Sequence, residues 1–254
     1  MLITERNPPL PASLDNSKLR ARALAKLLVG CTAMSGLLFT ASAQAFPIGQ
    51  WAYAEQGGYL YTRTDIQSRK TGRIHWLTED GFLEVYRIIS VKRKAKNGRE
   101  WIRVLMPARP NGRAGWVLRD RLGRIHHATK QLHLNRHYHR AVLWSKNKRS
   151  SWDRIWSAPI AVGKQSTPTP GGTFWIREKI RSLRSSNTYG PWAFGTSAYS
   201  VLSDWPGGGV VGLHGTNQPW LIGRSVSHGC IRIRNHDIAK LARHLEVGTP
   251  LIIR

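Results

Sequence analysis

Cysteine is scarce in this chain of 254 residues, which contains only Cys31 and Cys230. Cys31 lies in an N-terminal apolar run with the features of a signal segment. Removal of that segment would leave Cys230 without an intramolecular disulfide partner in an oxidising compartment. An unpaired exported thiol has two explanations: a buried cysteine that packs as a small apolar side chain, or a nucleophile held as thiolate by basic neighbours.

Long apolar runs are also lacking, and the only one extends from Leu27 to Thr40. It is shorter than the ~20 residues of a membrane-spanning helix, it follows a basic stretch, and it precedes small-residue cleavage patterns ending at Ala43 and Ala45. We therefore predict a signal peptide over residues 1–45 and export to the cell wall or periplasmic space. Membrane association is expected only through this segment, if it stays uncleaved.

The stretch Leu28-Val29-Gly30-Cys31 offers an alternative, because it resembles a lipobox that would place a lipid on Cys31. Lys26 leaves little apolar sequence before the cysteine, and the apolar run continues past it. Both features favour an ordinary signal core.

Acidic residues are few: the chain has 14 Asp and Glu but 39 Lys and Arg, which gives a formal net charge of +25. The signal segment accounts for only three of these charges. Such a field attracts polyanions. For an exported protein this indicates anionic cell-wall polymers, anionic lipid surfaces or acidic peptides, and we expect no nucleic-acid partner.

Residues 46–122 contain short apolar segments separated by turn residues, with no long helical period. Asn97-Gly98 between two apolar segments, 85–91 and 101–106, predicts a β-hairpin. We predict a small antiparallel β-barrel or sandwich. Gly115-Trp116-Val117 resembles bacterial SH3-like wall modules, which implies a binding or spacing domain. The alternative is a domain that only packs on its neighbour.

The polar and basic stretch 123–130 is predicted to be a linker, and histidines begin inside it. The cluster consists of His126, His127, His133, His137 and His139. Two of them could lie on one face of a strand and bind a metal. No Cys, Asp or Glu accompanies them, and the surrounding sequence is typical of strands around an Asn135-Arg136 turn. We therefore predict neither a metal site nor a cofactor.

Residues 131–254 are predicted to form a second, mixed β domain with one late helix. Proline and glycine at 167–172 and 206–209 interrupt regular structure. Val210 to Leu213 is a short buried strand that ends on His214. Asn235 is expected to cap a helix whose apolar residues follow at helical spacing. They are Ile238, Leu241, Ala242 and Leu245. Residues 251–253 close the chain as a strand.

The sequence Ser227-His228-Gly229-Cys230 leads into a segment that would alternate if extended. Ile231 and Ile233 would face the core, whereas Cys230, Arg232 and Arg234 would face the other side. Arg232 could favour the thiolate and hold a substrate carboxylate. For Arg234, a solvated basic edge is the better interpretation.

A cysteine nucleophile needs a base and an oxyanion site. We favour His214 over His228 as the base, because it comes from a separate strand end, with a backbone carbonyl such as that of Gly215 fixing its tautomer. His228 would shape the pocket or the charge of the thiol. Gly229 permits a sharp turn, and the amides of Gly229 and Cys230 could stabilise an oxyanion.

Four motifs in this order resemble the L,D-transpeptidase (YkuD-like) catalytic domain, over about Gln131 to Arg254. They are residues 167–173, His214-Gly215-Thr216, Ser227-His228-Gly229-Cys230-Ile231-Arg232 and Val247-Gly248-Thr249-Pro250. The resemblance implies a mainly β fold and action on peptidoglycan stem peptides. In that family the cysteine attacks the carbonyl carbon of the third stem residue and expels the terminal D-Ala. A side-chain amine of a neighbouring stem then takes up the acyl group, which gives a 3→3 cross-link.

Carried onto this sequence, the resemblance makes Cys230 the nucleophile, His214 the base and later the acid, and the amides near Gly229 the oxyanion site. It also implies that carbapenems acylate Cys230. One departure concerns the acyl acceptor: the family often has Asn where this chain has Arg232, and Asn235 comes later.

Three alternatives remain. A sortase would also use His, Cys and Arg, but it would have Thr-Leu-x-Thr before the cysteine. Papain-like and NlpC/P60-like hydrolases are not among the three, because they place Cys before His, the reverse of this order. A carboxypeptidase would share the acyl-enzyme and differ only in using water. A non-catalytic, cationic wall-binding protein with an inert Cys230 is the third alternative.

Overall fold

The computed structural model describes residues 49–254, except 93–97, 183–187 and 205. The predicted signal segment and Cys31 lie outside the described residues. Contacts group residues 46–254 into one compact unit. Over the residues that are described, no helix is both long enough and apolar enough to cross a membrane.

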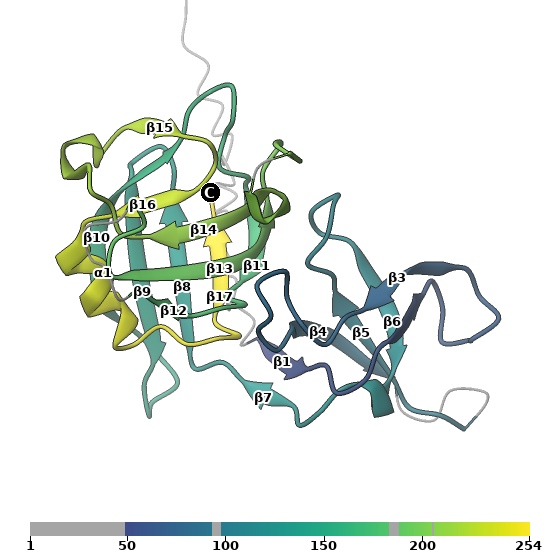
Figure 1. Ribbon diagram of the computed structural model, residues 1–254. Coiled ribbons are helices and arrows are strands. Elements are labelled where there is room, and N and C mark those ends of the chain that lie inside the picture. The colour runs from purple at the N-terminus through teal and green to yellow at the C-terminus, as the bar shows by residue number, and fades with distance from the viewer. Residues whose placement is uncertain (1–48, 93–97, 183–187, 205) are drawn as a thin grey trace, which may run out of the picture. The chain divides into compact units, whose positions relative to one another are not determined.

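The first half of the unit is a seven-stranded, wholly antiparallel sheet, which we call the N-terminal sheet (Figure 1). Its strands are β1 (Gln50–Tyr53), β2 (Gly58–Tyr61), β3 (Lys70–Ile74), β4 (Val85–Lys92), β5 (Trp101–Leu105), β6 (Ala114–Leu118) and β7 (His126–His127), in the order β3-β2-β6-β5-β4-β1-β7. The 3₁₀ turn η1 (Arg119–Arg121) follows β6. Strands β4 and β5 pair as the predicted hairpin; Asn97 lies outside the described residues.

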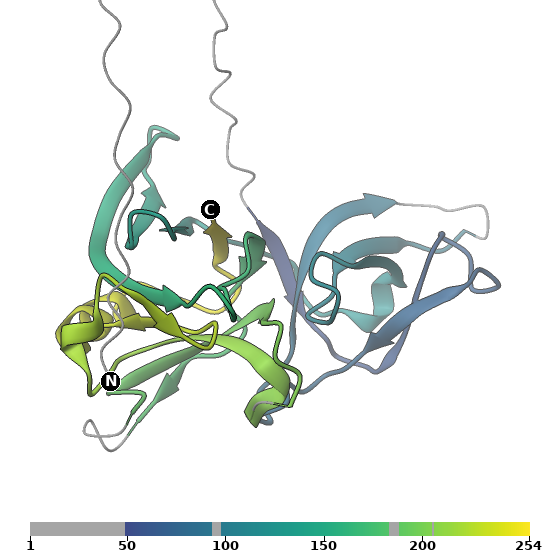
Figure 2. The same ribbon diagram turned by 90° about the horizontal axis from the view of Figure 1, so that it is seen from above.

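The second half is a mixed sheet of ten strands. They are β8 (Lys130–Asn135), β9 (Arg140–Lys146), β10 (Trp152–Gly163), β11 (Gly172–Trp175), β12 (Ile180–Arg181), β13 (Trp192–Tyr199), β14 (Val210–His214), β15 (Ser225–Ser227), β16 (Ile231–Ile233) and β17 (Pro250–Ile253). The order is β11-β17-β8-β9-β10-β16-β14-β13-β12, with β15 paired to β10. The long β10 bends along its length (Figure 2) and pairs with β9 and with β16. The 3₁₀ turns η2 (Pro206–Gly209) and η3 (Pro219–Leu221) lie in connections.

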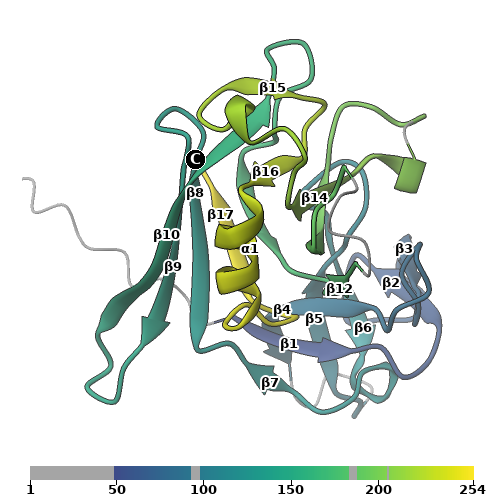
Figure 3. The same ribbon diagram turned by 60° about the vertical axis from the view of Figure 1, so that its left-hand side comes forward.

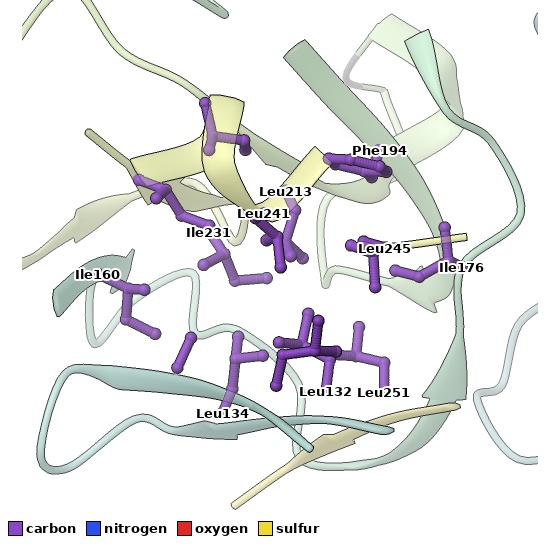
Figure 4. Close-up of a cluster of buried hydrophobic side chains, with 14 of the residues drawn as sticks. Leu132, Leu134, Ile160, Ile176, Phe194, Leu213, Ile231, Leu241, Leu245 and Leu251 are labelled. Atoms are coloured by element: carbon purple, nitrogen blue, oxygen red, sulfur yellow. The ribbon is translucent and has the colours of Figure 1, made fainter. Parts of the chain in front are cut away.

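Apolar side chains from two layers of the second half meet in its core. Figure 4 shows Leu132, Leu134 and Leu251 on one side and Leu213, Ile231 and Leu241 on the other. The one α-helix of the described residues, α1 (Asn235–Ala242), lies over the strands (Figure 3). It buries the predicted apolar residues Ile238, Leu241 and Ala242, because their spacing places them on one face. Leu245 lies beyond its end and is also buried.

The start of α1 differs from the prediction. Arg234 is the N-cap, without a side-chain capping bond, and Asn235 is the first helical residue. The Asn235 side chain instead accepts a hydrogen bond from the Thr216 amide at 2.8 Å. A local capping rule missed this contact because its partner lies nineteen residues earlier in the chain.

The predicted fold class, mainly β with one C-terminal helix, is confirmed for the described residues. The strand that ends on His214, the closing strand at residues 251–253 and the turn at Asn135-Arg136 are also confirmed. The SH3-like character of residues 46–122 and the domain boundaries stay predictions. Part of the predicted linker 123–130 is strand, since β7 pairs with β1.

The histidines of the cluster have separate surroundings. The ring of His126 stacks on Trp51 with centroids 4.3 Å apart, and His139 Nε2 lies 3.0 Å from Ser225 Oγ. His133 lies 3.2 Å from Gln131 Oε1. Within the described ranges, no group of three or more His, Cys, Asp or Glu side chains has a metal-binding arrangement.

A buried ion pair joins the N-terminal sheet to the second half. Arg177 Nε donates to Glu84 Oε1 at 2.8 Å, and its Nη2 bonds the other oxygen of Glu84 as well as Glu79 Oε2 at 2.8 Å. The side chains of Arg177 and Glu84 are 2% and 3% exposed. The Trp175 indole donates to the Val85 carbonyl at 2.8 Å beside them.

Arg177→Ala is expected to lower the free energy of unfolding by about 3–5 kcal/mol, because it leaves the Glu84 carboxylate buried without its cation. Denaturant unfolding of the purified protein measures this. The matched control is Arg99→Ala, which breaks the exposed Arg99–Asp120 pair and should cost at most about 1 kcal/mol. Equal losses in the two variants would contradict the burial argument.

Candidate active site

Two neighbouring strands bring Cys230 and His214 together. Strands β14 and β16 are parallel, with Leu213 opposite Ile231 and His214 opposite Arg232. Cys230 immediately precedes β16, so this register places it beside Gly212. The Gly212 amide accordingly donates to Cys230 Sγ at 3.4 Å. Burial alternates as predicted: Ile231 and Ile233 are fully buried, whereas Arg232 is only partly so.

The cysteine and the histidine line one cavity of about 430 Å³. Other lining residues are Asp80, Glu178, Ile180, Tyr189, Phe194 and Gly212. A Cβ added at Gly212 would lie 3.9 Å from both Cys230 Sγ and His214 Cδ2. The sulfur and the imidazole edge therefore face the same small space, which the absence of a side chain at Gly212 keeps open.

The imidazole of His214 is held in one tautomer. Its Nδ1 lies 2.6 Å from the Gly215 carbonyl oxygen; because a carbonyl only accepts, Nδ1 carries the proton and Nε2 has a lone pair. This confirms the predicted contact with Gly215. Tyr189 covers the ring edge-on, with centroids 4.8 Å apart. Burial lowers the pKa of His214 to about 4, and Arg232 adds to the effect while the Gly215 carbonyl opposes it.

The thiol of Cys230 is neutral in this environment. Burial raises its pKa above the ordinary value, and the Gly212 amide and Arg232 only partly offset that effect. The sequence predicted a thiolate held by basic neighbours. Arg232 does act in the predicted direction, but burial is the larger influence. The resting pair is therefore a thiol and a neutral imidazole, so the proton must move during nucleophilic attack.

The turn that carries the nucleophile is fixed by three hydroxyl groups. Ser227 Oγ donates to the Cys230 carbonyl at 2.6 Å and accepts from the Gly229 amide at 3.2 Å. Thr169 Oγ1 donates to the Gly229 carbonyl at 2.8 Å, and Thr167 Oγ1 donates to the Ser227 carbonyl at 3.1 Å. Gly229 has φ +118°, which favours glycine.

These bonds correct one prediction about the oxyanion site. The Gly229 amide is already used by Ser227 Oγ, so of the two predicted donors only the Cys230 amide is left for an oxyanion. Sequence reasoning placed Thr167 and Thr169 in a motif without a role. Thr169 stands between Pro168 and Pro170, and a hydroxyl residue in such a rigid setting was the signal that could have revealed its anchoring function.

Two other predicted residues lie outside the cavity lining. His228 is exposed and does not line the cavity with Cys230. Arg232 Nη1 donates to Gln218 Oε1 at 3.0 Å, and its Nε is buried without a hydrogen-bond partner in the described part of the chain. Arg232 therefore acts on Cys230 and His214 through its charge, and its role towards a substrate carboxylate stays a prediction.

A side chain of α1 fixes the turn that follows His214. Asn235 Oδ1 bonds the Thr216 amide, and a Cβ at Gly215 would lie only 2.4 Å from that oxygen. The close packing explains glycine after His214. Since Gly215 presents the carbonyl that orients the imidazole, Asn235 positions the base indirectly.

The cavity wall is acidic although the protein is strongly basic. Its charged lining residues are Asp80, from the N-terminal sheet's β3–β4 connection, and Glu178, which is 4% exposed. Burial raises the pKa of Glu178, and the nearby Asp80 carboxylate adds to this, while the Thr78 hydroxyl opposes it. Sequence reasoning did not find these two residues, because they come from separate sheets.

The pH dependence of Cys230 acylation is expected to follow the lowered pKa of His214. Its imidazole stays neutral, and able to accept the thiol proton, until the pH approaches about 4. The rate of carbapenem adduct formation, measured from pH 4 to 9, should therefore stay constant as the pH falls past about 6.5, the ordinary pKa of histidine. The rate should decrease only as the pH approaches about 4. An acid limb centred at or above that ordinary value would contradict the assignment.

Comparisons with known proteins identify the family of the second half of the chain. The family model of the L,D-transpeptidase catalytic domain (YkuD) matches residues 129–253. Two Bacillus subtilis (strain 168) proteins with the name "Putative L,D-transpeptidase" are similar in sequence. YkuD is 42% identical over 95 residues, covering 37% of this chain and 51% of that protein. YqjB is 32% identical over 103 residues, covering 37% and 56%.

The chain thus spans about half the length of these curated relatives. Among solved structures, an L,D-transpeptidase from Mycobacterium tuberculosis H37Rv is 17% identical and has a TM-score of 0.40. The alignment covers 67% of this chain and 90% of that one. On the match of the family model and the sequence relatives, residues 129–253 are a catalytic domain of the L,D-transpeptidase (YkuD) family.

Proposed function

We propose that this protein is an exported cysteine acyltransferase that forms 3→3 cross-links between peptidoglycan stem peptides through a thioester on Cys230. One observation carries the proposal: Cys230 Sγ and the His214 ring face the same cavity, and the Gly215 carbonyl leaves Nε2 of His214 free to accept a proton.

In the first half-reaction, His214 Nε2 takes the thiol proton as Cys230 Sγ attacks the carbonyl carbon of the third stem residue. The Cys230 amide stabilises the negative oxygen of the tetrahedral intermediate. The carbon–nitrogen bond to the terminal D-Ala then breaks, and protonated His214 gives its proton to the leaving amine. The products are D-Ala and a thioester.

In the second half-reaction, a side-chain amine of a neighbouring stem attacks the thioester carbon. A carbon–nitrogen bond forms, the carbon–sulfur bond breaks, and His214 carries the amine proton to the sulfur. The acidic wall supports an amine as the acceptor, because Asp80 and Glu178 are the charged residues lining the cavity. Carboxylates favour an ammonium-bearing side chain over a second carboxylate.

The location of this reaction is proposed to be the cell wall or periplasmic space, to which the signal segment would export the chain. The N-terminal sheet is proposed to be an SH3-like module. The net charge is +25 for the whole chain, and the signal segment accounts for three of these charges. The strongly positive remainder would keep the protein near anionic wall polymers.

The test is incubation of the purified protein with peptidoglycan, followed by digestion and mass analysis of the fragments. The proposal expects 3→3 dimers and released D-Ala. Cys230→Ala protein serves as the control and should give neither product. Release of D-Ala with tripeptides and no dimers would instead make the protein a carboxypeptidase.

Asp80→Asn is expected to lower the rate at which the amine attacks the thioester about tenfold, because it removes one charge-assisted hydrogen bond to the acceptor. The rate of thioester formation should stay unchanged. The measured quantity is the ratio of dimer to hydrolysed product. Asp120→Asn is the control, because Asp120 is exposed in the 3₁₀ turn η1, in the same half of the protein, and does not line the cavity. An unchanged ratio in both variants would contradict a role for the acidic wall.

A further inference from the structure

We propose that Arg109 and Asn111, which lie in the β5–β6 connection of the N-terminal sheet, are positioning residues for the catalytic turn of the second half. They hold the β13–β14 connection, which packs directly behind Gly229 and thereby sets the position of Cys230. The proposal rests on the proposed function, since it concerns the same nucleophile.

Arg109 is bound by backbone carbonyl groups of the β13–β14 connection. Its Nη1 donates to the Gly208 carbonyl at 2.7 Å, and its Nη2 donates to the carbonyls of Ser200 at 3.0 Å and Leu202 at 2.6 Å. The guanidinium also lies 4.9 Å from the centroid of the Tyr199 ring. One side chain therefore joins both ends of the connection, and its five rigid donors suit this task better than a lysine would.

The side-chain amide of Asn111 pairs with both backbone groups of Tyr199, the last residue of β13, as the backbone of a neighbouring strand would. Its Nδ2 donates to the Tyr199 carbonyl at 2.8 Å, and its Oδ1 accepts from the Tyr199 amide at 3.0 Å. The Tyr199 hydroxyl donates to Glu79 Oε1 at 2.5 Å. The N-terminal sheet thus fixes both the backbone and the side chain of Tyr199, immediately before Ser200.

Ser200 carries this constraint to the nucleophile. A Cβ added at Gly229 would lie 2.9 Å from Ser200 Cβ, so the two backbones are packed as closely as a glycine allows. The Ser200 amide donates to the Gly209 carbonyl at 2.9 Å. Gly209 has φ +76°, and a Cβ there would meet the Leu202 carbonyl oxygen and Arg109 Nη2. The connection is therefore shaped around the arginine.

This arrangement gives the N-terminal sheet a role in the chemical step. If the β13–β14 connection moved away from Gly229, the turn 227–230 would keep its hydroxyl anchors but lose the surface behind it. A displacement of about 1 Å of a reacting group can cost up to ~100-fold in rate. We therefore expect loss of Arg109 to slow acylation of Cys230 without removing the thiol, the base or the cavity.

The experiment compares carbapenem acylation of Arg109→Ala, Asn111→Ala and Arg109→Lys variants of the full chain by time-resolved intact mass. The fraction of protein that carries the adduct at the end of the reaction gives the number of active sites. The rate constant at saturating carbapenem describes those sites alone, so unfolded protein does not lower it. For Arg109→Ala and Asn111→Ala we expect this constant to fall about tenfold, with the half-saturating carbapenem concentration little changed. Arg109→Lys should recover only part of the rate.

Arg103→Ala is the matched control, because Arg103 is exposed on β5 and its loss changes the net charge equally. It should acylate at the parent rate. A merely structural role for Arg109 would reduce the number of active sites and leave their rate constant unchanged, and that result overturns the proposal. Failure of the parent protein to acylate at all would instead refute the proposed function.

Discussion

Cys230→Ala is expected to abolish acyl-enzyme formation completely, because no other described side chain supplies a thiol to the cavity. The variant should stay folded. Its main loss is one hydrogen bond from the Gly212 amide to the sulfur, at 3.4 Å. Sulfur is a weak acceptor, so this bond contributes about 1 kcal/mol or less. Intact-mass analysis after carbapenem treatment measures the adduct, and thermal unfolding measures the fold.

Cys31→Ala is the matched control, since it removes the other cysteine of the chain. This variant should form the adduct as the parent does. A carbapenem adduct on the Cys230→Ala protein would show that another side chain is acylated and would contradict Cys230 as the nucleophile. A parent protein that is folded but never labelled would support the alternative of a non-catalytic wall-binding protein.

His214→Ala has the second-largest expected effect, a decrease in acylation rate of ~10²–10⁴. The thiol of Cys230 is neutral because burial raises its pKa, so attack requires a base that removes the proton during the reaction. His214 is the histidine that lines the cavity, and its Nε2 has the lone pair for this step. The rate of adduct formation at saturating carbapenem gives the measurement.

His228→Ala provides the comparison for this variant. His228 is exposed and two residues from the nucleophile, and its loss should change the rate far less. If the two variants exchanged these results, the base role would pass to His228 and the argument from the Gly215 contact would be wrong.

The sequence predicted the elements that depend on local order. The strand ending on His214 could be found because apolar residues stop at a polar one, and the alternation around Cys230 could be found because strand side chains alternate. The order of the histidine and cysteine motifs indicated the family. Even the contact between His214 and the Gly215 carbonyl was accessible, since the two residues are adjacent.

Features that depend on long-range contacts could not be predicted. Asn235 appeared to be a helix cap because Thr216 is close only in the folded chain. Burial of Cys230 depends on how several strands pack, so the sequence overestimated the influence of Arg232 on the thiol. Asp80 and Arg109 come from the other sheet, and nothing in their local sequence relates them to the nucleophile.

The most direct test of the account is intact-mass analysis of the protein during reaction with a tetrapeptide stem ending in D-Ala. The account predicts a transient species in which Cys230 carries the acyl group of the tripeptide, together with one released D-Ala. Addition of a stem with a side-chain amine should convert this species to a 3→3 dimer. Dimer formation by the Cys230→Ala protein, or turnover with no adduct on that sulfur, would contradict the account.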